Sequence, residues 1–420
     1  MHHFEYRNGV FHCEDVPLPK IAEEIGTPFY VYSHATLLRH FTVFDKAFEK
    51  IPHLVCFAVK ANSNLAVLRI FAKAGGGADI VSGGELYRAQ RAGIPANKIV
   101  YAGVGKTRPE IRAALEAGIL MFNVESSQEL LTIDAVAAEM GVKAPVALRV
   151  NPDVDPKTHP YISTGLRNNK FGIAWQTALE EYRNAARMPN IEVVGVHKHI
   201  GSQITLVSPF MDALERTLEL VTQLKSEGIN IRYVDIGGGL GITYKDEAPP
   251  HPDDLAKNIG PMLEQTGCTI VFEPGRVIVG NAGALVARTL YTKSGAEKTF
   301  FIVDAAMNDL ARPSLYGSYQ NIVPVEEEAA RRHKVSADVV GPICESGDFL
   351  AKDRVLPELR PGDLVAVMSA GAYGFTMSSN YNSRPRAPEV LVSGVRYDVI
   401  RPRETFEHLV AGETIPAYLE

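Results

Sequence analysis

Lys60 is a residue of this chain whose type and setting suggest covalent chemistry. It follows the apolar run Val55–Val59, and a lysine next to such a run is partly desolvated, which lowers its pKa and frees the amine as a nucleophile. Considered alone, Lys60 is better explained as a strand-end lysine whose amine reaches solvent. Asp79 follows the next apolar run and would give Lys60 a polar neighbour, whereas Ser82 fits a helix N-cap. The surroundings of Lys60 must therefore decide its role.

Two glycine-bearing segments follow apolar runs later in the chain. Asp235–Gly241 contains three consecutive glycines, and Glu273–Arg276 contains one. Glycine lets backbone N–H groups approach an anion closely, so the two segments together predict a phosphate site. The triple glycine alone is also consistent with a tight connection between a strand and a helix.

Glu273 places a carboxylate beside this predicted anion site, which a phosphate does not need. A pyridinium nitrogen would explain the carboxylate, because an anionic partner keeps that nitrogen protonated and makes a pyridoxal ring a stronger electron sink. The simpler interpretation of Glu273 is an ion pair with Arg276. The two interpretations are compatible in different states of the enzyme.

His197 and His199 close another apolar run and have the spacing of residues that face the same way on a strand. Such a pair suits a metal ion, but no further His or carboxylate ligand is evident at other strand ends. The alternative is that one imidazole stacks on an aromatic cofactor ring while Ser202 donates to the cofactor's phosphate. The spacing alone does not decide between the two interpretations.

The elements that must position these residues are repeated βα units, because runs rich in Val, Ile and Phe alternate with longer amphipathic segments. Eight such strands within about 250 residues favour a (β/α)8 TIM-type barrel over a doubly wound sheet, the alternative. A barrel gathers the carboxyl ends of its strands into one site. The long irregular segment Asn151–Asn169 has a length that is usually functional or mobile. The predicted strands are 55–59, 78–82, 98–102, 120–124, 146–150, 193–197, 233–236 and 269–272. The predicted helices include 64–73, 84–91, 109–116, 127–140, 177–188, 210–227 and 253–264.

A second, β-rich domain is expected after about Ala282, where the texture changes to repeated β-type runs. We therefore divide the chain into a barrel over 34–281 and a β-rich domain made of 1–33 plus 282–420. The first part of the latter includes Phe4–Cys13, which resembles a hairpin around an Asn-Gly turn. The β-type runs are 284–291, 300–304, 334–340, 363–368 and 389–399.

The composition is that of an ordinary soluble enzyme. The chain is 46% hydrophobic and 22% charged with a formal net charge of -6, which does not point to nucleic acid or a membrane. No apolar leader or bilayer-spanning run is visible. The four cysteines lack the short spacings of zinc sites or disulfide frameworks, which favours a reducing compartment. We expect a cytoplasmic protein.

Together these motifs resemble the fold-type III pyridoxal-phosphate-dependent decarboxylases, over nearly the whole chain. The resemblance implies that pyridoxal 5'-phosphate is bound as an internal Schiff base on Lys60, that His199 stacks on its ring and that Glu273 is the pyridinium partner. It implies that no metal is needed. The cofactor-binding residues that the resemblance implies are Lys60, Asp79, His199, Ser202, Gly239, Glu273, Pro274, Gly275, Arg276 and Tyr373.

The resemblance extends to the second domain. Gly341–Asp348 is similar to a loop that enters the partner subunit's active site in a homodimer, which would make Cys344 the proton donor. Gly371–Phe375 resembles the segment whose tyrosine, here Tyr373, meets cofactor and substrate, and 382–386 also matches the family. A free cysteine such as Cys344 is otherwise most often a small buried hydrophobe.

Within the family, the chain is most similar to the group that acts on diaminopimelate. This substrate has a second amino-acid head, so its pocket needs a cation and an acid, which Arg312 and Glu345 would supply. Arg312–Tyr316 resembles the group's substrate loop, and Arg276 adds a second guanidinium for a carboxylate. Tyr373 would also contact the substrate. Without the resemblance, Arg312 and Glu345 would be interpreted as a surface ion pair, which contributes little to stability.

The expected reaction is therefore the decarboxylation of meso-2,6-diaminopimelate to L-lysine, the last step of lysine biosynthesis by resemblance. The near alternative is an ornithine or arginine decarboxylase on the same scaffold. A catalytically dead binding protein is a further alternative, which Lys60, Glu273 and Cys344 argue against. A metal-dependent hydrolase using His197 and His199 is the last.

Overall fold

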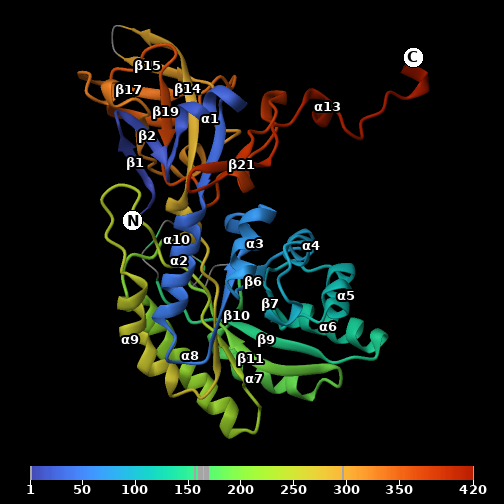
Figure 1. The fold of residues 1–420 in the computed structure, drawn as a ribbon. Helices are drawn as coiled ribbons and strands as arrows, with labels where there is room; N and C mark the ends of the chain where they lie inside the picture. The colour runs from blue at the N-terminus through green and yellow to red at the C-terminus, as the bar shows by residue number, and fades with distance from the viewer. Residues whose placement is uncertain (1, 156–157, 159–163, 165–169, 296–297, 420) are drawn as a thin grey trace. The chain divides into compact units, whose positions relative to one another are not determined.

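The computed structural model describes residues 2–155, 158, 164, 170–295 and 298–419 (Figure 1). The chain divides into two compact units. One is Leu37–Val279, and the other combines Met1–Thr36 with Gly280–Glu420. The first unit therefore contains all of the predicted βα segments, and the second contains the N-terminal hairpin together with the later β-type runs.

The first unit is a closed barrel of parallel strands, as predicted. Each strand pairs with the next along the chain, and the pairing of the last strand with the first closes the ring. Its strands are β5 (His53–Ala58), β6 (Gly77–Ile80), β7 (Ile99–Tyr101), β8 (Met121–Val124), β9 (Ala144–Asn151), β11 (Ile191–His197), β12 (Tyr233–Asp235) and β13 (Thr269–Phe272). A short strand, β10 (Ile173–Ala174), pairs with β9 outside the ring.

Helices follow the strands because their ends carry strong stop and start signals. Ser82 and Ser126 accept the N–H of the third residue of their helices, and Thr107 forms a capping box with Glu110. The N-cap interpretation of Ser82 is thus confirmed. Around the barrel in Figure 1 lie α3 (Leu65–Lys73), α4 (Gly83–Arg91), α5 (Arg108–Ala117), α6 (Ser127–Met140), α7 (Trp175–Arg187), α8 (Ser208–Ser226) and α9 (Pro252–Glu264).

Apolar side chains fill part of the barrel interior. Strands on all sides contribute to one buried cluster, so this part of the barrel is a packed core and not a channel. Polar side chains then gather where the strands end. The cluster consists of Cys56, Val100, Met121, Ala147, Val194 and Val271.

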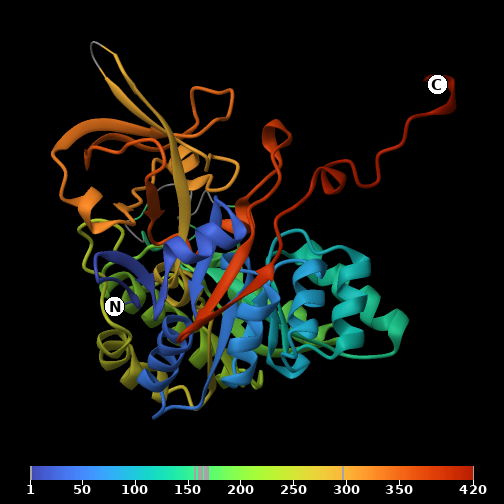
Figure 2. The ribbon, with the colours of Figure 1, turned by 45° about the horizontal axis from the view of Figure 1, so that its top comes forward.

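The second unit is built mainly from sheet. Its larger sheet has the order β18-β17-β15-β14-β4-β20-β21, with β19 and β16 branching from β14 (Figure 2). These strands are β4 (Phe29–Ser33), β14 (Gly283–Ser294), β15 (Thr299–Val303), β16 (Ile322–Pro324), β17 (Lys334–Val340), β18 (Phe349–Pro357), β19 (Leu364–Val367), β20 (Glu389–Ser393) and β21 (Arg396–Arg401). A three-stranded sheet is formed by β1 (Phe4–Arg7), β2 (Val10–Cys13) and β3 (Val16–Pro17).

The second unit departs from the predicted runs in four places. The predicted run 389–399 is a hairpin, since Gly394 adopts a φ of 60° and reverses the chain between β20 and β21. Three strands that we did not predict, β4, β16 and β18, belong to the main sheet. The predicted N-terminal hairpin is present, with Asn8 and Gly9 both at positive φ.

Short helices in this unit are α1 (Leu18–Ile25), α11 (Arg312–Tyr316), α12 (Glu327–Ala330) and α13 (Phe406–Leu409). The helix α2 (His34–Ala47) contains the division between the units.

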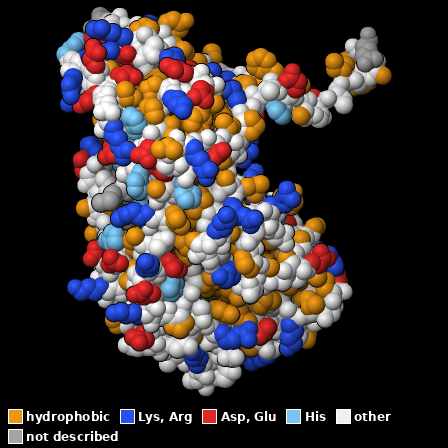
Figure 3. Space-filling view, in the orientation of Figure 1, with side chains coloured by type: hydrophobic (Ala, Val, Ile, Leu, Met, Phe, Trp, Pro, Cys, Tyr) orange, Lys and Arg blue, Asp and Glu red, His pale blue; other side chains and the backbone are white. Residues whose placement is uncertain are grey.

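Charged side chains are mixed on the visible face of the molecule. Acidic and basic groups alternate over the face in Figure 3, as the small net charge leads one to expect. Among the described residues, no helix has both the length and the apolar character that crossing a membrane requires.

Candidate active site

Lys60 lies at the carboxyl end of the barrel strands. The strand β5 ends at Ala58, earlier than predicted, and Lys60 belongs to a turn of 3-10 helix, η1 (Val59–Ala61). Its Nζ lies 2.5 Å from Oδ2 of Asp79, and its side chain is 38% exposed while that of Asp79 is fully buried. Burial, aided by Glu273, raises the pKa of Asp79 to about 7, although Lys60 opposes the shift. Lys60 is thus held by a buried acid instead of simply reaching into solvent.

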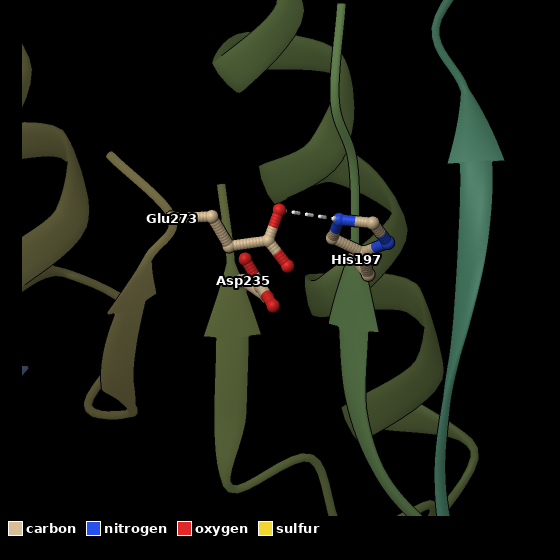
Figure 4. A group of neighbouring side chains, drawn as sticks. All are labelled: His197, Asp235 and Glu273. Atoms are coloured by element: carbon tan, nitrogen blue, oxygen red, sulfur yellow. Dashed lines mark ion pairs between the residues drawn. The ribbon is translucent and has the colours of Figure 1, made fainter. Parts of the chain in front are cut away.

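Glu273 follows β13 directly and is buried. Its Oε1 accepts from Asn123 Nδ2 at 3.1 Å, and its Oε2 lies 3.5 Å from Nε2 of His197 (Figure 4). Burial alone would raise the pKa of Glu273, but His197 and Lys60 outweigh it and hold that pKa well below its usual range. Glu273 is therefore an anion inside the barrel end.

The glycine segment after β12 packs tightly on its neighbours. A Cβ on Gly238 would lie 2.1 Å from the carbonyl oxygen of Glu273, and one on Gly239, whose φ is 117°, would lie 2.5 Å from that of Gly201. Only glycine fits such approaches. No helix begins until α9 at Pro252, so the interpretation of the triple glycine as a tight strand-to-helix connection is wrong.

Arg276 and Ser202 meet beside this segment. Arg276 begins α10 (Arg276–Val279) and is buried; its Nη2 donates to Ser202 Oγ at 3.0 Å and its Nη1 to the Tyr244 hydroxyl at 2.6 Å. A guanidinium and two hydroxyls next to glycine backbone make a site suited to an anion. Gly275 packs closely too, because a Cβ there would lie 3.1 Å from the side chains of Ala58 and Ala61.

The two histidines after β11 have different surroundings. His197 lies inside the barrel, whereas His199 lies beyond the strand and accepts from the N–H of Gly238 through Nδ1 at 3.1 Å. Burial, with a smaller effect of Arg149, holds the pKa of His199 well below its usual value. Lys198, between them, lies under α8 with Nζ 5.8 Å from the centre of the Phe210 ring.

Carboxylates do stand next to His197, contrary to our expectation from the sequence. One ligand atom each from His197, Asp235 and Glu273 lies within 4.8 Å of the others. Judged by distance alone, these three atoms could bind one cation together. However, Asn123 Nδ2 donates to Asp235 Oδ2 at 2.9 Å as well as to Glu273, so hydrogen-bond donors already occupy positions on both carboxyl groups.

Part of the predicted loop Asn151–Asn169 lies outside the described residues. Thr158 donates to the carbonyl of Ser202 at 2.8 Å, and Thr164 donates through Oγ1 to the carbonyl of His199 at 3.1 Å. These two contacts place both threonines against the backbone that carries two predicted site residues.

Cys344 and Glu345 belong to the second unit and form a group of their own with its neighbouring loops. Cys344 is exposed, so the interpretation of a buried hydrophobe is wrong, and its N–H donates to Asn382 Oδ1 at 2.8 Å. Glu345 accepts from the Tyr381 hydroxyl at 2.8 Å. Ser314 of α11 donates to the Gly347 carbonyl at 2.6 Å, which ties this loop to the predicted substrate loop.

The remaining predicted residues of the second unit also have special settings. Arg312 begins α11 and is only 6% exposed, so it is not part of a surface ion pair; Tyr316 ends the same helix. Tyr373 adopts a φ of 55°, which non-glycine residues rarely do, and such backbone is most common at functional sites.

Sequence reasoning missed Asn123 and Tyr244. Asn123 had a signal, because it is a polar residue inside the apolar run of β8. Tyr244 had none, since its contact with Arg276 joins positions 32 residues apart. Asp235 was noticed only as the start of the glycine segment.

Comparisons with known proteins agree with this site. Residues 34–280 match the family described as pyridoxal-dependent decarboxylase, pyridoxal binding domain. The class of protein is thus a pyridoxal-dependent decarboxylase, a barrel enzyme with an amine and a carboxylate at the carboxyl ends of its strands.

Close relatives narrow the class. The chain is 55% identical over 414 residues to the diaminopimelate decarboxylase of Pseudomonas aeruginosa, covering 98% of this chain and 99% of that protein. The Helicobacter pylori diaminopimelate decarboxylase structure complexed with L-lysine has a TM-score of 0.91 at 43% identity, covering 94% and 98% of the two chains. The M. jannaschii enzyme in co-complex with L-lysine has a TM-score of 0.94 at 40% identity and covers 100% of both. This chain belongs to the diaminopimelate decarboxylases, which are pyridoxal-phosphate-dependent carboxy-lyases.

The residues present fit the cofactor of this family. Oδ1 of Asp79 and both ring nitrogens of His197 are buried, and no group among the described residues hydrogen-bonds them. The glycine cradle that a Cβ would fill lies beside Arg276 and Ser202, as a phosphate requires. Lys60 supplies the amine and Glu273 the carboxylate.

The close approach at Gly238 predicts that Gly238→Ala damages the site. The added methyl must push apart the ends of β12 and β13, so we expect a loss of about 1–3 kcal/mol in the free energy of unfolding and weaker binding of pyridoxal phosphate. Urea unfolding followed by the fluorescence of Trp175, the single tryptophan, reports on the barrel.

Gly260→Ala is the matched control. Nothing lies within 4 Å of a Cβ at this helical position, so the variant should bind cofactor normally and gain up to about 1 kcal/mol. Equal behaviour of the two variants would contradict the tight packing at Gly238.

Proposed function

We propose that this chain decarboxylates meso-2,6-diaminopimelate to L-lysine and that Lys60 binds pyridoxal phosphate through its amine. The observation that carries the proposal is the meeting of Lys60, Glu273 and the Arg276–Ser202 pair at one end of a barrel. Membership of the family supports the substrate. L-Lysine, which both of the related structures named above contain, is what remains of diaminopimelate after one carboxylate leaves as carbon dioxide and a proton takes its place.

The residues around Lys60 prepare the site for this cofactor. When bound, pyridoxal phosphate supplies an aldehyde for amines and a ring that accepts the electron pair of the bond being broken. Asp79 receives or returns a proton at the Lys60 amine, which its pKa of about 7 allows. Glu273 presents a negative charge to the ring nitrogen. His199, neutral because burial lowers its pKa, offers an uncharged ring for stacking.

The phosphate is assigned to the glycine segments after β12 and β13. Gly239 packs against the backbone of Gly201, Pro274 lies beside Gly238, and Gly275 packs on Ala58 and Ala61, while Ser202 and Arg276 add a hydroxyl and a cation. Five N–H donors on one guanidinium suit a phosphate or carboxylate held at two points. We assign Arg276 to the cofactor phosphate or to a substrate carboxylate.

The far amino-acid head of the substrate is assigned to the second unit. Arg312 would pair with the far carboxylate and Glu345 with the far ammonium, with Tyr316 and Tyr373 completing the contacts. The burial of Arg312 supports this role, because a desolvated guanidinium pairs more strongly with a carboxylate than an exposed one does. The hydrogen bond from Tyr381 fixes the Glu345 carboxylate.

The site is proposed to be shared between two copies in a homodimer. Cys344 and Glu345 are exposed on a loop that hydrogen bonds with Asn382 and Ser314 hold in place. Their side chains are therefore available, in a fixed geometry, to a partner subunit. In a dimer this loop would enter the partner's barrel, and Cys344 would return the proton that replaces the lost carboxylate. The exposure of its thiol supports that assignment.

The alternatives fare less well. An ornithine or arginine decarboxylase would have no far carboxylate for the buried Arg312, and the curated relatives at about half identity are diaminopimelate decarboxylases. The metal-dependent hydrolase is less well supported, because Asn123 already donates hydrogen bonds to both carboxyl groups beside His197. The intact Lys60, Glu273 and Cys344 argue against an inactive binding protein.

A reducing, cytoplasmic compartment is proposed from the cysteines. All four are free thiols; Cys13, Cys56 and Cys268 are buried and Cys344 is exposed. Exposed free thiols persist in reducing surroundings.

Carbon dioxide release from meso-diaminopimelate, ornithine, arginine and lysine, assayed side by side, tests the substrate. Because a site that holds a far carboxylate rejects substrates without one, kcat/KM for diaminopimelate should exceed the others by on the order of 10³-fold or more. Faster release from ornithine or arginine would establish the alternative decarboxylase instead.

Mixed dimers test the shared site. Lys60→Ala and Cys344→Ala subunits should each be nearly inactive alone, whereas their random mixture should regain about one active site in four, because one heterodimer site has both intact residues. Activity is measured after the mixed dimers have been verified by mass spectrometry. If verified heterodimers stay inactive, the shared site is wrong.

A further inference from the structure

Four polar side chains meet inside the barrel, near the carboxyl ends of its strands. Asn123 comes from β8, His197 from β11, Asp235 from β12 and Glu273 from the end of β13. All are buried. Figure 4 shows the His197 ring directed at the Glu273 carboxylate, with the Asp235 carboxyl group next to it.

Asn123 links the two acids of this group. Its Nδ2 donates to Asp235 Oδ2 at 2.9 Å and to Glu273 Oε1 at 3.1 Å. The N–H of Gly237 donates to the other oxygen of Asp235 at 2.9 Å. Each carboxyl group is therefore held in one orientation by donors from other strands or loops.

Two carboxylates this close inside a protein do not both stay ionised, because like charges repel strongly where water is absent. One of them must hold a proton. The cationic or protonatable neighbours of Glu273 are Lys60, His197 and His199, whereas Asp235 has the neutral donors Asn123 and Gly237, the Glu273 carboxylate and one protonatable neighbour, the buried Lys198. The surroundings thus favour the negative charge on Glu273.

The acid strengths of the two groups agree with this geometry. Burial, reinforced by the Glu273 carboxylate, raises the pKa of Asp235 well above its usual value, although Gly237 and Asn123 oppose the shift. The pKa of Glu273 is shifted the other way. Asp79, the third buried acid nearby, is paired with Lys60 and shares the same repulsion from Glu273.

We propose that Asp235 is a positioning residue: it holds the proton of the Asp235–Glu273 pair, donates it in a hydrogen bond to Glu273 and so leaves Glu273 as the charged member. Asn123 fixes the pair, and Nε2 of His197 lies beside the other oxygen of Glu273. The consequence, that Glu273 keeps its charge for the ring nitrogen, rests on the proposed function. The location of the proton does not.

Infrared spectroscopy locates the proton, because a protonated carboxyl group has a C=O stretching band that a carboxylate lacks. At neutral pH, with and without pyridoxal phosphate, the protein should show acid absorption with a component that Asp235→Asn removes, while the component of Asp79, whose pKa is about 7, remains. Asp134→Asn is the matched control; Asp134 is a part-buried acid that accepts from Asn190, and its replacement should leave the band. An unchanged band in the Asp235 variant overturns the proposal.

The absorption of bound cofactor gives a second measurement. Asparagine preserves a neutral side chain at position 235, so the pH midpoint of the cofactor spectrum should stay that of the parent, whereas Glu273→Gln should shift it by about 1–3 pH units. A shift of similar size in Asp235→Asn would show that a charge was lost there and would overturn the proposal.

Two further outcomes keep the test decisive. If the Asp235 variant does not fold, neutron diffraction of the unchanged protein should show deuterium on the Asp235 carboxyl group; deuterium on Glu273, or on neither, overturns the proposal. Failure of the protein to bind pyridoxal phosphate would contradict the proposed function alone. The infrared band of the cofactor-free protein would still decide the place of the proton.

Discussion

The negative charge of Glu273, buried at the end of a barrel strand, is the interaction on which the rest of the site depends. A buried carboxylate is costly unless donors and cations surround it. Here Asn123 on β8 donates to Glu273, Nε2 of His197 on β11 lies 3.5 Å from its carboxylate, and Lys60 after β5 supplies the nearby cation. The closed barrel brings these distant strands together, so the fold and the charge require each other.

The same barrel end is reinforced by buried ion pairs that do not touch the Lys60–Glu273 group directly. Lys106 donates to Glu129 at 2.6 Å and to the Asn123 carbonyl at 3.0 Å, which fixes the strand that carries Asn123. Arg149 donates to Glu125 at 2.8 Å and to the His199 carbonyl at 3.4 Å. Breaking a buried pair of this kind typically costs about 3–5 kcal/mol, because an uncompensated charge remains. These pairs therefore fix the backbone of Asn123 and His199.

Sequence reasoning found the barrel because local patterns determine it. Each predicted barrel strand is present, and residues that follow strands, such as Lys60 and Glu273, lie together as the carboxyl-end rule requires. The strand ends were less exact; β5 stops at Ala58 and Lys60 lies in a turn. In the second unit, the run 389–399 predicts a single β segment, and the turn at Gly394 divides it into two strands.

What could not be predicted depends on contacts between distant segments. The hydrogen bond of Tyr244 to Arg276 and the bridge from Asn123 to two acids leave no periodic pattern in the sequence. Asp235 looked like part of a glycine turn, and its role as a buried acid appears only when β12 is placed beside β13. The β4 strand carries the aromatic and β-branched residues typical of a strand and was overlooked, whereas its pairing with β14 and β20, more than 200 residues away, leaves no local signal.

The most direct measurement of the central claim is borohydride reduction of the protein with pyridoxal phosphate, followed by peptide mapping. Lys198 is the strictest internal control for Lys60, since it is a buried lysine at the same end of the barrel, after β11, and burial lowers its pKa to about 8. The arrangement of Lys60, Asp79 and Glu273 predicts that the reduced cofactor is found on the peptide with Lys60 and on no other. Label on Lys198 or any other lysine, with Lys60 unmodified, would contradict it.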